Sequence, residues 1–182
     1  MSEATAVPLT IIIEVSESDY DLGAAWTNLQ KAVGTGVGAM AGFSGLVRSS
    51  TTTDAGGSRV DEPVKALVLE HYPGMTESSM AAIVAKATQR WELLGVHVVH
   101  RVGRFVPGEQ IVMVLVAAGH RAAAFAACEY IMDYLKTDAV LWKREDYLRD
   151  EEQAALESQQ GARWLHSAAE DKARRAGWAE ED

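Results

Sequence analysis

Basic side chains near the ends of predicted elements are the residues of this chain best suited to chemistry. The segment Ala118-Gly119-His120-Arg121 ends a predicted strand and opens a predicted helix. It therefore places an imidazole and a guanidinium beside free backbone N–H groups, which is typical of an anion site. A cation at a helix N-terminus costs roughly 0.3 to 1 kcal/mol, because the helix dipole already makes that end positive. A binding function would explain that cost, and a salt bridge from Arg121 to one of the many acids would explain it equally well.

Other basic residues are ambiguous when each is considered alone. Lys136 lies at the C-terminal end of the same predicted helix, where the dipole favours a lysine without any function. Lys143 and Arg144 follow a predicted strand, and such a basic pair commonly protects a strand edge from aggregation. Arg48 closes an otherwise apolar strand. None of these residues predicts a function by itself.

Two patterns that could suggest a cofactor or a metal do not have the required arrangement. Gly34, Gly36 and Gly38 follow a predicted helix and precede a predicted strand, which is the reverse of a nucleotide-binding loop. We expect them to provide a helix stop and a close backbone approach instead. His97 and His100 are three residues apart in a predicted strand, so their side chains point to opposite faces and cannot easily share a metal ion. We therefore expect no cofactor and no metal.

Composition excludes several classes of protein. Ser44 lacks the G-x-S-x-G spacing of a hydrolase nucleophile, and Cys128, the single cysteine, is expected to be a small buried hydrophobe. The net charge of -9 argues against non-specific nucleic-acid binding, so any bound anion needs a local basic pocket. No apolar run approaches the roughly 20 residues that cross a bilayer, and the N-terminus lacks the features of a signal peptide. We expect a cytoplasmic protein that does not bind membranes.

The elements that would position these side chains alternate between strands and helices. We predict a first helix that is capped by Ser18 or Asp19 and ends before Gly34. Residues 49–62 are predicted to form a mobile polar loop, and 96–102 is predicted to pair with 110–118 as an antiparallel hairpin. A further helix is predicted over 151–160. The remaining predictions are strands at 9–15, 37–47, 64–72 and 139–142, and helices at 76–94 and 121–136. This order favours an α+β fold over a doubly wound one. We divide the chain into one domain, 1–165, and a charged flexible tail, 166–182, which has too few apolar residues to order itself without a partner surface.

Several blocks of the sequence, taken together, resemble the molybdopterin synthase catalytic subunit family. The most specific are Glu-His-Tyr-Pro-Gly-Met at 70–75 and Met-Asp-Tyr-Leu-Lys at 132–136. The similarity runs from about residue 9 to 145, with a late match at 163–164. The other matching blocks, in the same order as in the family, are 43–48, 100–103, 107–109, 120–121 with Phe125, and 142–145.

The resemblance implies an α/β-hammerhead type fold, with a mixed or antiparallel sheet and flanking helices, and a sulfurtransferase activity. A homodimer would bind one small ubiquitin-like sulfur-carrier subunit on each protomer, forming a heterotetramer. The carrier's C-terminal Gly-Gly thiocarboxylate would transfer sulfur to cyclic pyranopterin monophosphate, forming the dithiolene of molybdopterin in molybdenum cofactor biosynthesis. Both the thiocarboxylate and the cyclic phosphate are anions, which agrees with the basic residues described above.

The resemblance also assigns roles to individual residues. Arg48, His120 and Arg121 would bind the anions, because arginine suits bidentate recognition of phosphate or thiocarboxylate. Lys136 would be the general acid/base or transition-state stabiliser, and Lys143 is the second catalytic candidate. Phe43 and Met132 are expected to form the apolar wall of the carrier-tail pocket, and core packing explains them equally well.

Departures from the family pattern leave other readings open. The segment after Arg48 is longer than usual and offers Ser49 and Ser50 instead of the usual polar residues. An arginine that family members place near the chain end has no evident equivalent, although Arg174 and Arg175 are candidates. The rival readings are a non-catalytic member that only binds the carrier and an enzyme acting on another phosphorylated heterocycle.

Overall fold

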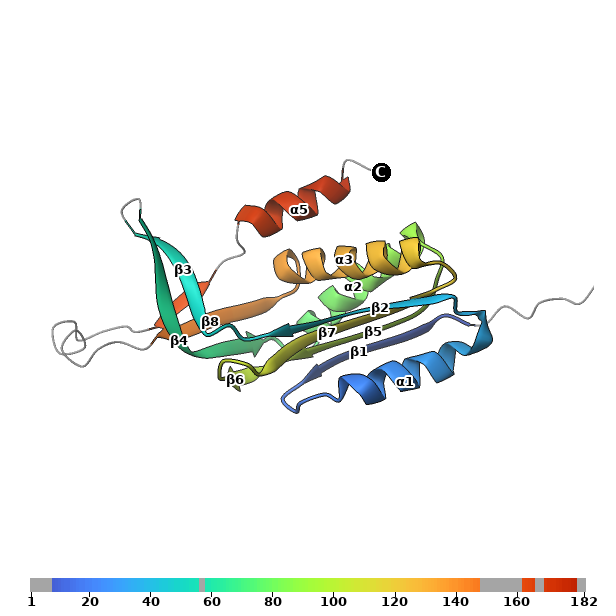
Figure 1. Cartoon of the computed structure of the whole chain (residues 1–182), viewed down its shortest axis with the longest axis horizontal. Coiled ribbons are helices and arrows are strands. Elements are labelled where there is room, and N and C mark those ends of the chain that lie inside the picture. Colours follow the sequence, from blue (N-terminus) through green and yellow to red (C-terminus); the bar gives the residue numbers. More distant parts are fainter. Residues whose placement is uncertain (1–7, 56–57, 148–161, 166–168, 180–182) are drawn as a thin grey trace, which may run out of the picture.

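A computed structural model describes residues 8–55, 58–147, 162–165 and 169–179 of the chain (Figure 1). A mixed sheet forms its centre, with strand order β1-β5-β7-β2. β1 runs parallel to β5, and the other neighbouring strands are antiparallel. Its strands are β1 (Thr10–Ser16), β2 (Ala39–Leu46), β5 (Leu93–Arg101) and β7 (Gln110–Ala118).

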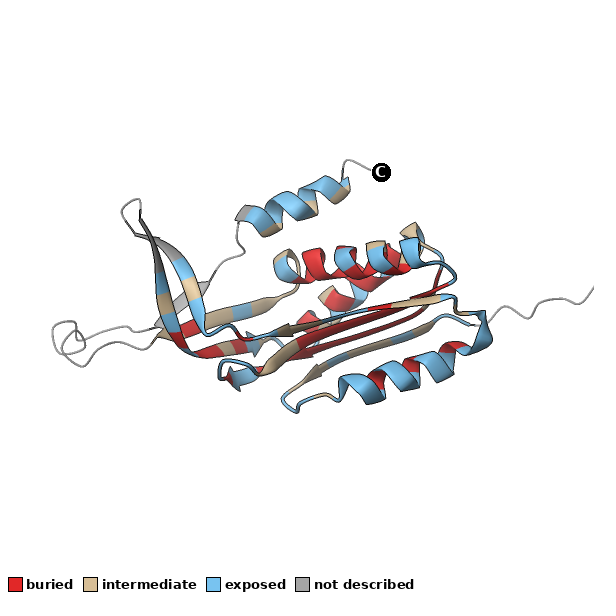
Figure 2. Cartoon of the chain, in the orientation of Figure 1, coloured by how far each residue is buried: buried red, intermediate tan, exposed pale blue. Residues whose placement is uncertain are grey.

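Helices cover both faces of the central sheet. α1 (Leu22–Val33) packs on one face, while α2 (Met75–Arg90) and α3 (Arg121–Thr137) pack on the other (Figure 1). α1 buries Ala25, Leu29 and Val33, whose spacing places them on one helix face. Figure 2 shows the buried residues concentrated on the central strands and on the helix sides that face them. Among the described residues, no helix is long and apolar enough to cross a membrane.

A second sheet extends from one end of the central sheet and has the strand order β3-β4-β8-β9, with β6 also paired to β4. In Figure 1 the β3–β4 hairpin projects away from the body of the molecule. A small core that includes Leu69 and Phe105 joins the two sheets. The strands are β3 (Ser50–Ala55), β4 (Ser58–His71), β6 (Gly103–Phe105), β8 (Leu141–Tyr147) and β9 (Ala162–Leu165).

The α+β class, with a mixed sheet and flanking helices, is confirmed, and so is the antiparallel pairing of β5 with β7. The expected helix stop is confirmed at Gly34, which has a φ of 65° directly after α1. The close backbone approach is confirmed at Gly38, where a Cβ would lie 2.1 Å from the carbonyl oxygen of Gly119. Any other residue at position 38 would push these two segments apart.

Two predicted boundaries are wrong. Asp21, not Ser18 or Asp19, caps α1, and its side chain accepts a hydrogen bond of 2.9 Å from the backbone N–H of Ala24. The helix expected over 76–94 ends at Arg90, because the residues from Leu93 onwards belong to β5. Gly95 is therefore not a helix stop. It lies in β5 where a Cβ would meet side chains of α1 at 2.6 and 2.9 Å.

The loop expected over 49–62 is also wrong, because most of it forms the paired strands β3 and β4. Its polar composition suggested a loop, but a hairpin that projects into solvent also carries polar side chains. Thr51 and Thr52, for example, lie in β3 and are well suited to a strand.

The C-terminal part of the chain contains an ordered helix. Residues Ala169–Ala179 form α5, which packs against α3 and so has the partner surface that the sequence required. The division at residue 165 stays a prediction. The helix expected over 151–160 lies outside the described residues.

Candidate functional site

The two predicted catalytic lysines flank the short connection between α3 and β8. Lys136 lies in the last turn of α3, and Lys143 lies on β8 opposite Leu69 of β4. Burial lowers the pKa of Lys143 below its usual 10.5, and the neighbouring charge of Lys136 lowers it further. Asp171 and Glu145 partly oppose this shift. The site therefore holds a lysine that releases its proton more easily than a solvated lysine does.

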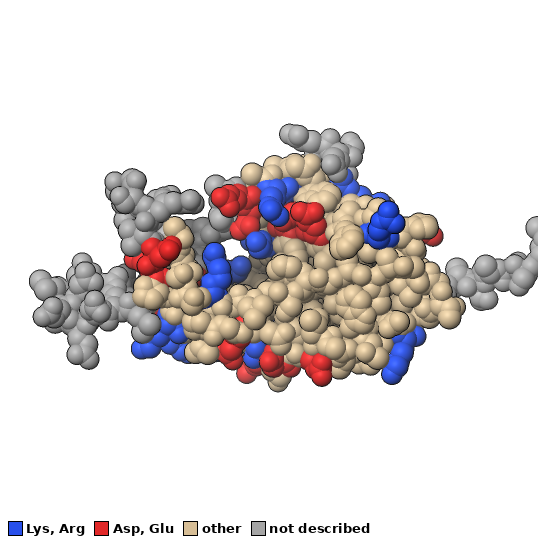
Figure 3. Space-filling model, viewed as in Figure 1, with Lys and Arg blue, Asp and Glu red and all other residues tan. Residues whose placement is uncertain are grey.

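Asp171 of α5 contacts the first of these lysines. Its Oδ1 lies 3.1 Å from Nζ of Lys136, and the aspartate side chain is 23% exposed. Figure 3 shows Lys and Arg side chains beside an opening beneath α5, with Asp and Glu side chains next to them near the start of that helix. Asp171 was not among the residues predicted from the sequence, because residues 166–182 have the composition of a flexible tail.

Polar contacts between α5 and α3 fix the position of Asp171. Arg175 donates two hydrogen bonds of 2.9 Å to the carboxylate of Asp138, which lowers the pKa of that carboxyl despite its partial burial. Nε1 of Trp178 donates to Asp133 at 2.9 Å. Arg174 lies 3.6 Å from Glu129 of α3. Arg174 and Arg175, the two candidates for the arginine that family members place near the chain end, thus both contact α3 or its C-cap in their own chain.

Glu145 connects the projecting hairpin to the strand that carries Lys143. This carboxylate is buried and accepts hydrogen bonds from Thr51 Oγ1 at 2.9 Å and from the Tyr147 hydroxyl at 2.6 Å. Thr51 belongs to β3, so the hairpin is attached to β8 two residues beyond Lys143. The hairpin thereby becomes one wall of the region around the lysines.

Arg48, Phe43 and Met132 lie on the elements that surround the lysines. β2 and α3 both run toward the end of the central sheet where β7 begins, so Arg48 after β2 and Lys136 near the end of α3 share that end (Figure 1). Arg48 is exposed, Phe43 is 41% exposed and Met132 is buried one helical turn before Lys136. Because Met132 is buried and Phe43 is not, packing in the core explains the presence of Met132 better than it explains the presence of Phe43.

His120 and Arg121 lie at the other end of α3. Both are exposed, and no described acid forms an ion pair with Arg121, so a salt bridge does not explain its position within the described part of the chain. Helical rise places Arg121 about 22 Å from Lys136 along the helix axis. Within one chain the predicted basic residues therefore form two separate groups, His120 with Arg121 and Arg48 with the lysines.

The two histidines of β5 point to opposite faces, as expected from their spacing. Nε2 of His97 lies 2.8 Å from Glu14 on the α1 side, while Nδ1 of His100 bonds to the carbonyl oxygen of Arg101. Cys128 is buried, as predicted, and burial raises the pKa of its thiol to about 11. Neither His97 nor Cys128 lies in the lysine region.

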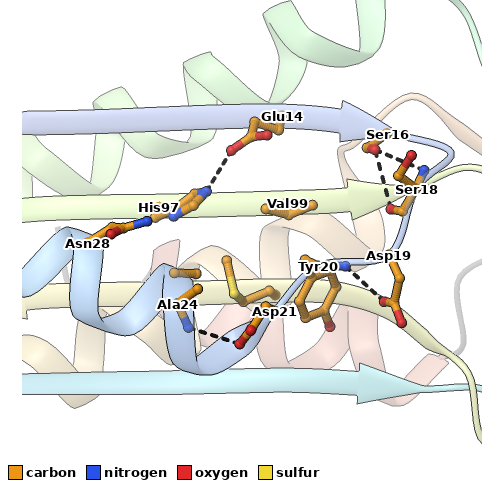
Figure 4. Close-up of a pocket in the computed structure, with 12 residues that line it drawn as sticks. Glu14, Ser16, Ser18, Asp19, Tyr20, Asp21, Ala24, Asn28, His97 and Val99 are labelled. Atoms are coloured by element: carbon orange, nitrogen blue, oxygen red, sulfur yellow. Dashed lines mark hydrogen bonds and ion pairs between the residues drawn. The ribbon is translucent and has the colours of Figure 1, made fainter.

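A pocket of about 230 Å³ lies between α1 and the central sheet, on the sheet face opposite to the one that α3 covers (Figure 4). Glu14, Asp19, Asp21 and His97 are among its lining residues, and no lysine or arginine lines it. Such a pocket disfavours anions, so it does not compete with the lysine region as an anion site.

Comparison with known proteins gives consistent matches over most of the chain. The family model described as MoaE protein matches residues 15–138. A molybdopterin synthase catalytic subunit of Ralstonia nicotianae is 46% identical over 166 residues, which cover 91% of this chain and 83% of the relative. One of Pseudomonas aeruginosa is 41% identical over 168 residues, covering 92% and 99%. The solved structure of a molybdopterin biosynthesis MoaE protein of Burkholderia ambifaria superposes with a TM-score of 0.71 at 40% identity, covering 93% and 99%.

Proposed function

The chain belongs to the MoaE protein family, and on that premise we propose that it is the catalytic subunit of a molybdopterin synthase. It would transfer sulfur from the C-terminal thiocarboxylate of a small ubiquitin-like carrier to cyclic pyranopterin monophosphate. The observation that carries this proposal is the pair formed by Lys136 and the partly buried Lys143, with Arg48 at the same end of the central sheet. Such a group of cations suits two anionic reactants. We place the reaction in the cytoplasm.

The two lysines have different environments, which suggests different roles. Lys143 has a lowered pKa and is the better group for moving a proton at neutral pH. Lys136 has an anionic partner, Asp171, and would stabilise negative charge on the thiocarboxylate or on the transition state. Arg48 would bind the second anion, the phosphate of the pterin.

A homodimer would bring the second group of basic residues into the reaction. His120 and Arg121 are exposed and lie too far along α3 to reach the lysines of their own chain. We propose that they bind the anionic reactants at the lysine site of the neighbouring protomer. Each protomer would also bind one carrier subunit, so that the assembly is a heterotetramer. Phe43, exposed on β2, would contact the carrier tail in this assembly, with Met132 beneath it.

Reconstitution tests the proposed function. The purified protein is mixed with a thiocarboxylated carrier and cyclic pyranopterin monophosphate, and molybdopterin is measured. Product that requires both proteins is expected. Carrier binding without product would point instead to a non-catalytic family member, and indifference to the pterin would point to an enzyme for another heterocycle.

A further inference from the structure

β2 is an edge of the central sheet without the features that normally protect an edge. Among the described strands it pairs with β7 alone, so its other side presents backbone N–H and C=O groups that no described strand pairs. Its eight residues include no charged residue and no proline. The other edge strands β1, β3 and β9 carry Glu14, Asp54 and Arg163. A long, uncharged edge is typical of a strand that pairs with another chain.

Apolar side chains lie exposed beside this edge. Phe43 of β2 is 41% exposed, and Phe125 of α3 is 66% exposed. Phe43 points to the sheet face that α3 covers, because Ala41, two residues earlier, belongs to the same core cluster as Ala124 of α3. The edge strand and the helix above it therefore present one joint apolar surface, which is the kind of surface that a partner protein covers.

One side of α3 overhangs the β2 edge. The opposite side faces α2, since Tyr130 packs against Trp91 at the end of α2 with a centroid distance of 5.3 Å, and Nζ of Lys86 in α2 lies 5.8 Å from the ring of Tyr134. α2 contacts β1 at the far edge of the sheet, whereas α3 contacts β7 and β2. At 100° per residue, the side of α3 that points away from α2 carries Arg121, Phe125, Met132 and Lys136.

The spacing of these four residues is self-complementary. The intervals between them are four, seven and four residues, so the pattern reads the same in both directions. Two antiparallel copies of α3 lying side by side would set Phe125 of one protomer against Met132 of the other. They would also set Arg121 beside Lys136. A contact that is related to itself by a two-fold axis requires such a pattern.

We propose that β2 is the homodimer interface and pairs antiparallel with β2 of a second copy, so that the two central sheets form one continuous sheet. α3 lies over β7 and β2, so the two α3 helices would be about two strand spacings apart. That is about 10 Å, a usual distance between packed helices. The same geometry puts both helices on one face of the joint sheet.

The position of α3 over the sheet sets the register of this pairing. Cys128 lies next to the centre of the symmetric pattern, and its Sγ is 3.9 Å from the carbonyl oxygen of Val114. Val114 pairs with Phe43. The two-fold axis therefore passes near Phe43, and the Phe43 side chains of the two protomers would lie side by side. Phe43 would have this role besides its proposed contact with the carrier tail.

This dimer would join the two separate groups of basic residues. Reversing α3 brings His120 and Arg121 of one protomer to the helix end that carries Lys136 in the other. These like charges repel one another, and a bound anion between them would offset the repulsion. The inference thus rests on the proposed function, which assigns residues of two protomers to one site, and it names the surface that brings them together.

Cysteine cross-linking tests the register without turnover. Phe43→Cys should form a disulfide between the two chains under mild oxidation, because residues opposed in an antiparallel pair have Cβ atoms about 4.5–5.5 Å apart. Leu46→Cys is the matched control. Leu46 is also exposed, at 53%, but its two copies would lie about 20 Å apart along the strands and should not cross-link. The wild-type protein has only the buried Cys128 and should not cross-link either.

A second variant tests the contact between the helices. Phe125 is exposed in the protomer, so Phe125→Glu should leave the protomer folded. It would bury two carboxylates at the symmetric interface and should weaken dimerisation about a hundredfold, as measured by sedimentation equilibrium. Met75→Glu, at a position that is 53% exposed at the start of α2, is the matched control and should stay dimeric.

Failure of Phe43→Cys to cross-link would overturn the proposal, and so would a Phe125→Glu protein that dimerises like the wild type. A Phe125→Glu protein that stays dimeric but no longer binds the carrier would assign this surface to the carrier instead. Neither measurement requires molybdopterin. A protein that shows this dimer but makes no molybdopterin would therefore reject the proposed function and retain the interface.

Discussion

The features that suit Lys143 to its proposed role are unfavourable for folding. Its ammonium is largely removed from water and lies near a second positive charge, so its pKa is lowered. Below the folded pKa the lysine is charged in both the folded and the unfolded state, and folding bears the full cost of burying the charge. That cost decreases as the pH rises through the folded pKa toward 10.5.

We therefore expect Lys143→Met to increase the free energy of unfolding by about 1 kcal/mol at pH 7 while abolishing sulfur transfer. Urea unfolding at pH 7 and pH 10 measures the effect, and the difference from wild type should be smaller at pH 10. A variant that is less stable than wild type at pH 7 would show that burial of Lys143 costs nothing.

Individual residues of the proposed site differed in how well their roles could be predicted from the sequence. Lys136 and Lys143 were found because they lie in sequence blocks that resemble a family. Asp171 gave no such signal. The contact between Asp171 and Lys136 depends on how α5 packs. Spacing along the chain does not reveal such tertiary contacts.

At the scale of elements, α5 illustrates the same limit. The sequence from 166 onward is charged and has few apolar residues, so it predicted a flexible tail. Trp178 nevertheless anchors the helix, because its ring packs edge-on against Trp91 and Tyr130 with centroid distances of 5.8 and 5.5 Å. Arg90 also donates to the carbonyl oxygen of Trp178 at 2.7 Å. One well-packed aromatic residue can order a short polar helix that hydrophobic content alone would not predict.

Removing this anchor should release α5. We expect Trp178→Ala to lower the free energy of unfolding by about 2 kcal/mol, because it removes the aromatic packing and leaves the buried Asp133 without its donor. Urea unfolding measures the change. Trp142→Ala is the matched control, since Trp142 is 48% exposed and its loss should change stability by only about 0.5 kcal/mol. Equal effects of the two variants would contradict the anchoring role.

Most other elements were predicted correctly in kind because apolar periodicity specified them. α1, α3 and the strands of the central sheet all form at the positions that their patterns indicated, to within a few residues. The errors arose where local composition and tertiary pairing disagree, as in β3, whose serine and threonines resemble a loop but pair along β4.

At the scale of the whole molecule, the separation of the basic residues gives the proposed dimer a test. If the lysines of one protomer act with Arg121 of the other, Lys136→Ala and Arg121→Ala should each abolish activity in a homodimer. Co-expression of the two variants would form mixed dimers, each with one intact site. Random association makes about half of all dimers mixed, so about a quarter of the wild-type activity should return.

Mixed dimers purified with two different affinity tags provide the cleanest measurement, and each variant expressed alone with both tags is the control. Activity that does not return in the purified mixed dimer would mean that each site is built from a single chain.

The long-range strand pairing also determines when the proposed reaction centre can form during synthesis. Lys143 is placed by the pairing of β8 with β4, and Asp171 reaches Lys136 only through α5, so both depend on late segments of the chain. A nascent chain can assemble the central sheet once β7 and α3 have left the ribosome, but it still lacks β8. A carrier that binds the nascent chain early would therefore meet a folded scaffold that still lacks the second lysine. The protein would become reactive only at the end of translation.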